Sequence, residues 1–180
     1  MKTLYIYRQL FTVILLVCYT TAYTQNTEKQ VAEGNINNIP THFPIAKGDF
    51  KTISSPFGYR KHPILHKNKL HAGIDLVAPK GAAVLATASG IVQKSEYQKG
   101  YGNYILLAHF AEVQTLYAHL WISLVKKGDA VVQGQIIGLV GETGLATGPH
   151  LHYEVRVNNK KLDPMRIWKG IIREHSNNKV

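Results

Sequence analysis

The chain has 180 residues, and 21 lysines and arginines against 11 aspartates and glutamates give it a formal net charge of +10. Its one cysteine, Cys18, excludes both a disulfide framework and a cysteine-based zinc site. Any metal must therefore be bound by histidine, aspartate or glutamate, and the positive charge favours anionic partners.

The first 22 residues have the features of a secretory signal peptide. Lys2 and Arg8 precede an apolar run over residues 10–18, and small or polar residues follow at 20–22. The run is shorter than the roughly 20 residues that cross a membrane, so no stable membrane span is expected after cleavage, and an uncleaved anchor is the alternative. We expect a secreted or periplasmic protein whose anionic partners are cell-envelope polymers or membrane surfaces rather than nucleic acid.

Composition then divides the remaining chain into three parts. Residues 23–42 are polar with few apolar anchors, which predicts a linker or a frayed segment. Residues 43–168 have the length of one ordinary domain. Residues 169–180 are polar again and are expected to form a tail.

The stretch "LHAGIDLVAP" contains His71 and Asp75, which could bind one metal ion together. Gly73 disfavours a helix here, and a straight strand would separate the two residues by about 13 Å along the backbone. The chain must therefore bend, most simply at Ala72 and Gly73. This places His71 on a turn and Asp75 on the strand that follows.

The rest of the domain is predicted to be mainly β, as a single antiparallel sheet or sandwich-like domain with glycine-rich hairpins. Residues 80–92 and 127–140 resemble each other, and each predicts a strand, a turn and a second strand. We interpret them as a lipoyl-like duplicated hairpin core.

The stretch "TLYAHL" alternates between polar and apolar residues and predicts a strand. Its alternation places Thr115, Tyr117 and His119 on one face. His119 could then reach the same sheet face as the histidines at the end of the domain. His109 is not assigned to the site.

A second alternating strand is predicted from "TGPHLHYEVRV". One face carries the apolar residues Leu151, Tyr153, Val155 and Val157, and the other carries His150, His152, Glu154 and Arg156. Two residues span roughly 6.6 Å along a strand, so both imidazoles can reach one small volume.

These residues suffice for a catalytic zinc site. His71, Asp75 and one of His150 and His152 supply three ligands and leave a fourth position for water, which Zn²⁺ can ionise near pH 7. The other histidine of the pair and His119 are available as acid/base groups, because the unperturbed pKa of an imidazole suits proton transfer. Spacing alone leaves open which of His150 and His152 is the ligand.

Residues 53–164 resemble the LytM/lysostaphin-like zinc metallopeptidases, which are bacterial cell-wall endopeptidases. The matching segments occur in the family's order, and they are "SSPFGYRKHPILHKNKLHAGIDLVAPKGAAV", "GYGNYILLAH", "TLYAHL" and "KKGDAVVQGQIIGLVGETGLATGPHLHYEVRVNNKKLDP". The resemblance implies a secreted zinc endopeptidase that acts on peptide stems or cross-links of peptidoglycan.

The resemblance also implies the role of each site residue. His71, Asp75 and His152 match the ligands of one zinc ion per chain. His119 and His150 match the two catalytic histidines, which orient or deprotonate the water and stabilise the transition state.

Two alternatives stay open beside this interpretation. One is a non-catalytic wall-binding or hydrolase-activating module of the same fold, and the other is a structural zinc site closed by a fourth protein ligand. Glu154 is either a partner of an imidazole or a surface charge, and Tyr59 and Arg60 are candidates to line a substrate groove. The sequence predicts neither the bond that is cut nor the oligomeric state.

Overall fold

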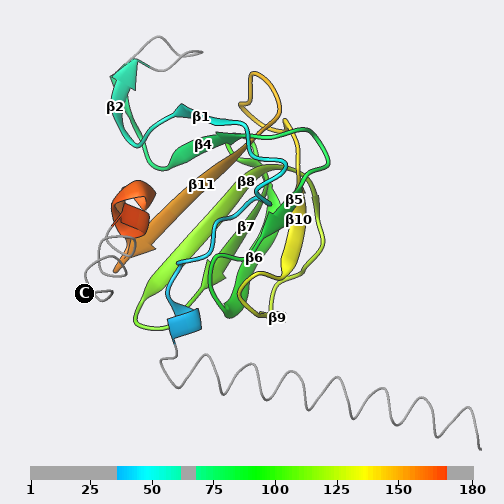
Figure 1. Ribbon diagram of the computed structural model, residues 1–180, viewed down its shortest axis with the longest axis vertical. Coiled ribbons are helices and arrows are strands. Elements are labelled where there is room, and N and C mark those ends of the chain that lie inside the picture. The colour runs from blue at the N-terminus through cyan, green and yellow to red at the C-terminus, as the bar shows by residue number, and fades with distance from the viewer. Residues whose placement is uncertain (1–35, 62–67, 170–180) are drawn as a thin grey trace, which may run out of the picture.

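The computed structural model of the protein describes residues 36–61 and 68–169 (Figure 1). The predicted signal peptide over residues 1–22, most of the linker and the tail beyond residue 169 lie outside this part of the chain. The predicted domain boundaries stay predictions. Among the described residues, no helix has the length and apolar character needed to cross a membrane.

Ten strands form one antiparallel sheet, as predicted for a mainly β domain (Figure 1). The strand order is β1-β4-β11-β8-β7-β6-β9, with β12 beside β11, β10 beside β8 and β5 beside β10. The strands of this sheet are β1 (Thr52–Ser55), β4 (Ile74–Val77), β5 (Ala83–Leu85), β6 (Gly90–Gln98), β7 (Gly102–Ala108), β8 (Val113–Ser123), β9 (Ala130–Val131), β10 (Ile136–Val140), β11 (His150–Val157) and β12 (Lys160–Leu162). A separate two-stranded sheet consists of β2 (Gly58–Lys61) and β3 (Asn68–His71), and a short 3-10 helix, η1 (Ile36–Asn38), begins the described chain.

The main core lies on one face of the large sheet. Tyr117 of β8 and Tyr153 of β11 are fully buried there with ring centroids 5.4 Å apart, and the Tyr153 hydroxyl donates to Thr87 Oγ1. Trp168, in a helical segment over residues 164–169, stacks on Tyr153 at 5.6 Å. Because the helical segment covers this face, the opposite face of β11 is left for polar side chains.

The two similar segments at 80–92 and 127–140 are combined differently from the prediction. Each predicted hairpin consists of two strands, β5 and β6 in the first segment and β9 and β10 in the second, but these strands pair across the two copies. β5 pairs with β10, and β6 pairs with β9. The connecting residues also bond across the copies, since Gly134 N–H donates to the Ala86 carbonyl. The duplication is therefore used as one interlocked unit.

Strand β8 is irregular at His119, and this irregularity brings His119 to the histidine face. The φ angle of His119 is 61°, and the pairing of β8 with both β7 and β10 shifts register near this residue. Tyr117 and Leu120 therefore both face the main core, whereas Ala118 and His119 do not. The prediction that Tyr117 shares a face with His119 was wrong, because it assumed regular alternation.

Candidate metal centre

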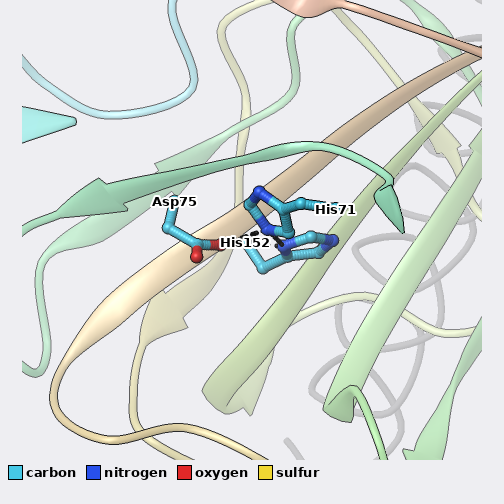
Figure 2. Close-up of side chains that lie close together, drawn as sticks. All are labelled: His71, Asp75 and His152. Atoms are coloured by element: carbon cyan, nitrogen blue, oxygen red, sulfur yellow. Dashed lines mark hydrogen bonds and ion pairs between the residues drawn. The ribbon is translucent and has the colours of Figure 1, made fainter. Parts of the chain in front are cut away.

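Three side chains from separate strands meet at one point on the polar face of the sheet. His71 ends β3, Asp75 lies in β4, and His152 lies in β11 directly opposite Asp75. His71 Nε2 and His152 Nδ1 are 3.1 Å apart and lie 3.1 and 2.8 Å from Asp75 Oδ1. Figure 2 shows the two rings and the carboxylate pointing toward one another. A single cation can contact all three.

The connection between β3 and β4 makes this convergence possible. The chain bends at Ala72 and Gly73, as predicted. His71 is the last residue of β3 rather than part of the turn, which corrects one detail of the prediction. A Cβ atom on Gly73 would overlap the Tyr153 carbonyl oxygen and approach its carbon to 2.8 Å. Only glycine lets the bend lie this close to β11.

The hydrogen bonds of the two histidines fix which nitrogen faces the centre. His71 Nδ1–H donates to the Pro56 carbonyl at 2.8 Å, and His152 Nε2–H donates to Glu154 Oε1 at 3.2 Å. When each ring carries its one proton on these nitrogens, Nε2 of His71 and Nδ1 of His152 present lone pairs to a cation beside the Asp75 carboxylate.

This donor set fits a zinc ion. Two imidazoles and a carboxylate are typical zinc ligands, and three protein ligands leave one position open in tetrahedral coordination. Among the described residues, this is the one group of at least three histidine, cysteine or acidic side chains close enough to hold a metal, and it has three members. No fourth protein ligand of these types belongs to it, which disfavours a closed structural zinc site.

The charges at the centre are balanced by close contacts. Burial would raise the pKa of Asp75, but hydrogen bonding and charge interactions with His152 and His71 outweigh burial and hold that pKa well below its usual value. Burial would lower the pKa of His152, yet Asp75 and Glu154 raise it. A positive charge is thus strongly favoured between these groups, and a divalent cation supplies it.

Glu154 is a buried partner of His152, so the first of the two alternatives left open for it is correct and the surface charge is excluded. Its side chain is fully buried. Oε1 accepts a hydrogen bond from the Tyr101 hydroxyl at 2.6 Å, and Oε2 accepts from Nε and Nη2 of Arg156 at 2.9 and 2.7 Å. Burial would raise the pKa of Glu154, but these partners and His152 lower it to about 2. The carboxylate therefore stays charged and holds the His152 ring in place.

His119 and His150 lie beside the three ligands. Their ring centroids are 4.7 Å apart, and the ring centroids of His119 and His152 are 5.8 Å apart. Nδ1–H of His119 donates to the Thr143 carbonyl and Nδ1–H of His150 donates to that of Gly148, both at 2.8 Å. In the neutral form of either ring, the lone pair is therefore on Nε2. Burial, followed by the nearby His150 and His152, lowers the pKa of His119 to about 4.

All five predicted site residues line one cavity of about 340 Å³. Arg60 also lines it, whereas Tyr59 is 83% exposed and is not among the lining residues. His109 lies elsewhere, buried between the Ser89 carbonyl and Thr115. The lining residues are Arg60, Lys69, Leu70, His71, Ala72, Asp75, Gln98, Gly100, Tyr101, His119, Leu145, Thr147, His150, His152, Glu154 and Lys161.

Sequence reasoning missed Tyr101 and Thr143. Tyr101 follows strand β6 in a glycine-rich turn and reaches Glu154, 53 residues away. Thr143 contributes its backbone carbonyl to the hydrogen bond with His119, and any residue type at this position would supply the same group. Only the glycines around Tyr101 could have drawn attention to its turn.

The fold and the centre together define a class of protein. An antiparallel sheet that gathers a His–Asp–His triplet, with two further imidazoles in the same cavity, is the site of a zinc-dependent metallopeptidase. The chain belongs to peptidase family M23, since residues 69–164, just over half of its length, match that family. The predicted resemblance to this class of zinc metallopeptidases is confirmed.

Individual relatives agree with this assignment. The chain is 48% identical over 135 residues to the DD-carboxypeptidase/endopeptidase Mpg of Neisseria meningitidis, covering 75% of this chain and 31% of the relative. A zinc containing peptidase from Vibrio cholerae superposes with a TM-score of 0.64 at 42% identity, covering 68% of this chain and 38% of that one. The catalytic domain of the antimicrobial peptidase lysostaphin from Staphylococcus simulans gives 0.61 at 34% identity, covering 66% of this chain and 92% of that one. The chain thus spans about a third or less of the curated relatives it matches, and nearly all of the lysostaphin catalytic domain.

Proposed function

We propose that this chain hydrolyses peptide cross-links or stems of bacterial peptidoglycan as a zinc endopeptidase. The observation that carries the proposal is the three-ligand centre with two further imidazoles, His119 and His150, beside it in one cavity. The substrate class is supported by the DD-carboxypeptidase/endopeptidase of Neisseria. A cell-envelope location, residues 43–168 as the metallopeptidase domain and peptidoglycan rather than nucleic acid as the partner follow from the same proposal.

His71, Asp75 and His152 would hold one zinc ion through Nε2, Oδ1 and Nδ1. When bound, the ion supplies a Lewis acid that polarises the scissile carbonyl and lowers the pKa of a water molecule. The protein keeps this geometry rigid, because each ligand histidine is fixed at its second nitrogen by the Pro56 carbonyl or by Glu154.

His119 and His150 would move the protons. The lowered pKa of His119 keeps its ring neutral at pH 7, and the Nδ1–H bonds to backbone carbonyls leave Nε2 of both rings free to accept a proton. One ring takes the proton of the attacking water, and protonated imidazole then donates to the developing oxyanion or to the leaving amine. The amide breaks without a covalent enzyme intermediate.

Digestion of purified cell wall by the zinc-loaded protein tests the proposal, with the released peptides identified by mass. His119→Ala should abolish release while zinc content stays at one per chain. His42→Ala is the matched control, because His42 is exposed and does not line the cavity. If His119→Ala released no peptide but kept the full biological effect of the wild-type protein, the result would instead support the non-catalytic wall-binding or hydrolase-activating module.

A further inference from the structure

Arg60 lies in the cavity wall with its guanidinium incompletely used. Its Nε is buried and has no hydrogen-bond partner, and its Nη2 is 3.6 Å from Asp75 Oδ2, beyond an ordinary hydrogen bond. Arg156, four residues from His152, is a useful comparison, because its Nε and Nη2 both bond to Glu154 within 2.9 Å. Arg156 is satisfied within the protein, whereas Arg60 has donors to offer a ligand.

A second basic residue stands opposite Arg60. Lys69 of β3 is its partner in the pairing of β2 with β3, and both residues line the cavity. Directly opposed like charges destabilise a pair of strands. Among the ion pairs of the described residues, Lys69 takes part in none and Arg60 takes part in one, the 3.6 Å contact with Asp75. The Asp75 carboxylate is itself a proposed zinc ligand. An anion bound between the two side chains would remove the repulsion.

We propose that Arg60, assisted by Lys69, forms a carboxylate-binding subsite, so that the preferred substrate is a peptide with a free carboxylate close to the scissile bond. This inference rests on the proposed peptidase function and specifies its substrate class. The planar guanidinium matches a carboxylate through paired hydrogen bonds, which an ammonium group does not reproduce.

The position of Arg60 limits where that carboxylate lies in the substrate. Arg60 contacts one oxygen of Asp75, and the other oxygen faces the metal centre. Since a peptide advances about 3.5 Å per residue, the carboxylate belongs to the residue beside the scissile bond or to its immediate neighbour. It is either the side-chain carboxylate of that residue or the carboxyl terminus of a peptide that ends close to the scissile bond.

Binding of three matched peptides distinguishes these sources. One cross-linked peptide keeps both carboxylates, one is amidated at the side chain, and one is amidated at the carboxyl terminus. The dissociation constants are measured with zinc-loaded His150→Ala protein, in which hydrolysis is silenced. We expect amidation of the recognised group to weaken binding about tenfold, as for a lost charge-assisted hydrogen bond. The source is the group whose amidation has this effect.

The Arg60→Gln change in the same background should remove that preference, and Arg60→Lys should restore it only in part. Lys47→Gln removes the same charge from an exposed position outside the cavity and should preserve the preference. Zinc content is measured for every variant, because Arg60 contacts Asp75. Equal affinity for all three peptides, or a preference that survives in Arg60→Gln, overturns the subsite. A binding preference without hydrolysis of any peptide by the wild-type protein overturns the peptidase function and leaves the subsite standing.

Discussion

Replacing Glu154 with glutamine tests whether the buried carboxylate positions His152 for zinc. Oε1 of Glu154 faces the donors of Tyr101 and His152, and Oε2 accepts two hydrogen bonds from Arg156. A glutamine side chain has the same shape but only one acceptor oxygen. Its amino group must face either the first two donors or the guanidinium, so at least one buried donor loses its partner.

The structure indicates the size of the effect. Lowering the pKa of Glu154 from 4.5 to about 2 corresponds to about 3 kcal/mol in favour of the carboxylate. Breaking a buried pair by removing one charge costs a similar amount, about 3–5 kcal/mol, but the Arg156 side chain is 20% exposed and can recover some solvation. We therefore expect the free energy of unfolding of the zinc-free protein to fall by about 2–3 kcal/mol. Zinc affinity should fall about 10–100-fold, as for other lost partners of ligand histidines.

Two measurements check this expectation. Competition with a chromogenic chelator gives the zinc dissociation constant, and urea denaturation of the zinc-free protein gives the free energy of unfolding. Glu142→Gln is the control, since that side chain is 49% exposed and its 3.6 Å contact with Lys80 is a surface ion pair. If Glu154→Gln matched wild type within about twofold in zinc affinity and about 0.5 kcal/mol in stability, the positioning role would be refuted.

Three further predictions concern the bend, a buried histidine and the metal. Gly73→Ala should destabilise the fold by several kcal/mol and weaken zinc binding, because its Cβ would overlap the Tyr153 carbonyl. Gly48→Ala is the control and should do neither, because the space around Gly48 is open. Thermal melts and zinc titrations measure both variants, and equal stability and zinc affinity of the two would contradict the prediction. His109 should stay neutral in the folded protein because burial lowers its pKa to about 4, while in the unfolded chain the ring takes up a proton near its ordinary pKa of about 6.5. The free energy of unfolding should therefore be fully maintained above pH 6.5 and fall by about 2–3 kcal/mol as pH drops to about 4.5; NMR titration of the His109 ring with a midpoint near 6.5 would contradict this. Chelation should abolish hydrolysis and lower Tm, and added zinc should restore both; activity that persists after verified removal of the metal would disprove the metal requirement.

The sequence predicted those parts of the fold that depend on local periodicity. Alternation in β11 placed Leu151 and Tyr153 in the core and His152 on the opposite face, and the structure agrees. The need for a bend between His71 and Asp75 was also predictable, because a straight strand cannot bring the two side chains to one cation. Both inferences use only distances along a strand, which hold in any sheet.

The remainder depends on contacts between distant segments, which a single sequence does not specify. The positive φ of His119 changes which residues of β8 face the cavity, and no residue type in "TLYAHL" marks such an irregularity. The burial of Glu154 depends on Tyr101, which reaches it from another strand connection. The exchange of strands between residues 80–92 and 127–140 could not be distinguished from two hairpins, since both arrangements satisfy the same local pattern.

That exchange of strands has a consequence for synthesis of the chain. When the ribosome has released only the first 126 residues, β5 and residues Gly90 and Ile91 of β6 have not yet met β10 and β9. Their backbone groups are then open sheet edges, which recruit strands from other chains. A fragment truncated before residue 127 should therefore self-associate, and native closure of the sheet must wait for translation of residues 130–140.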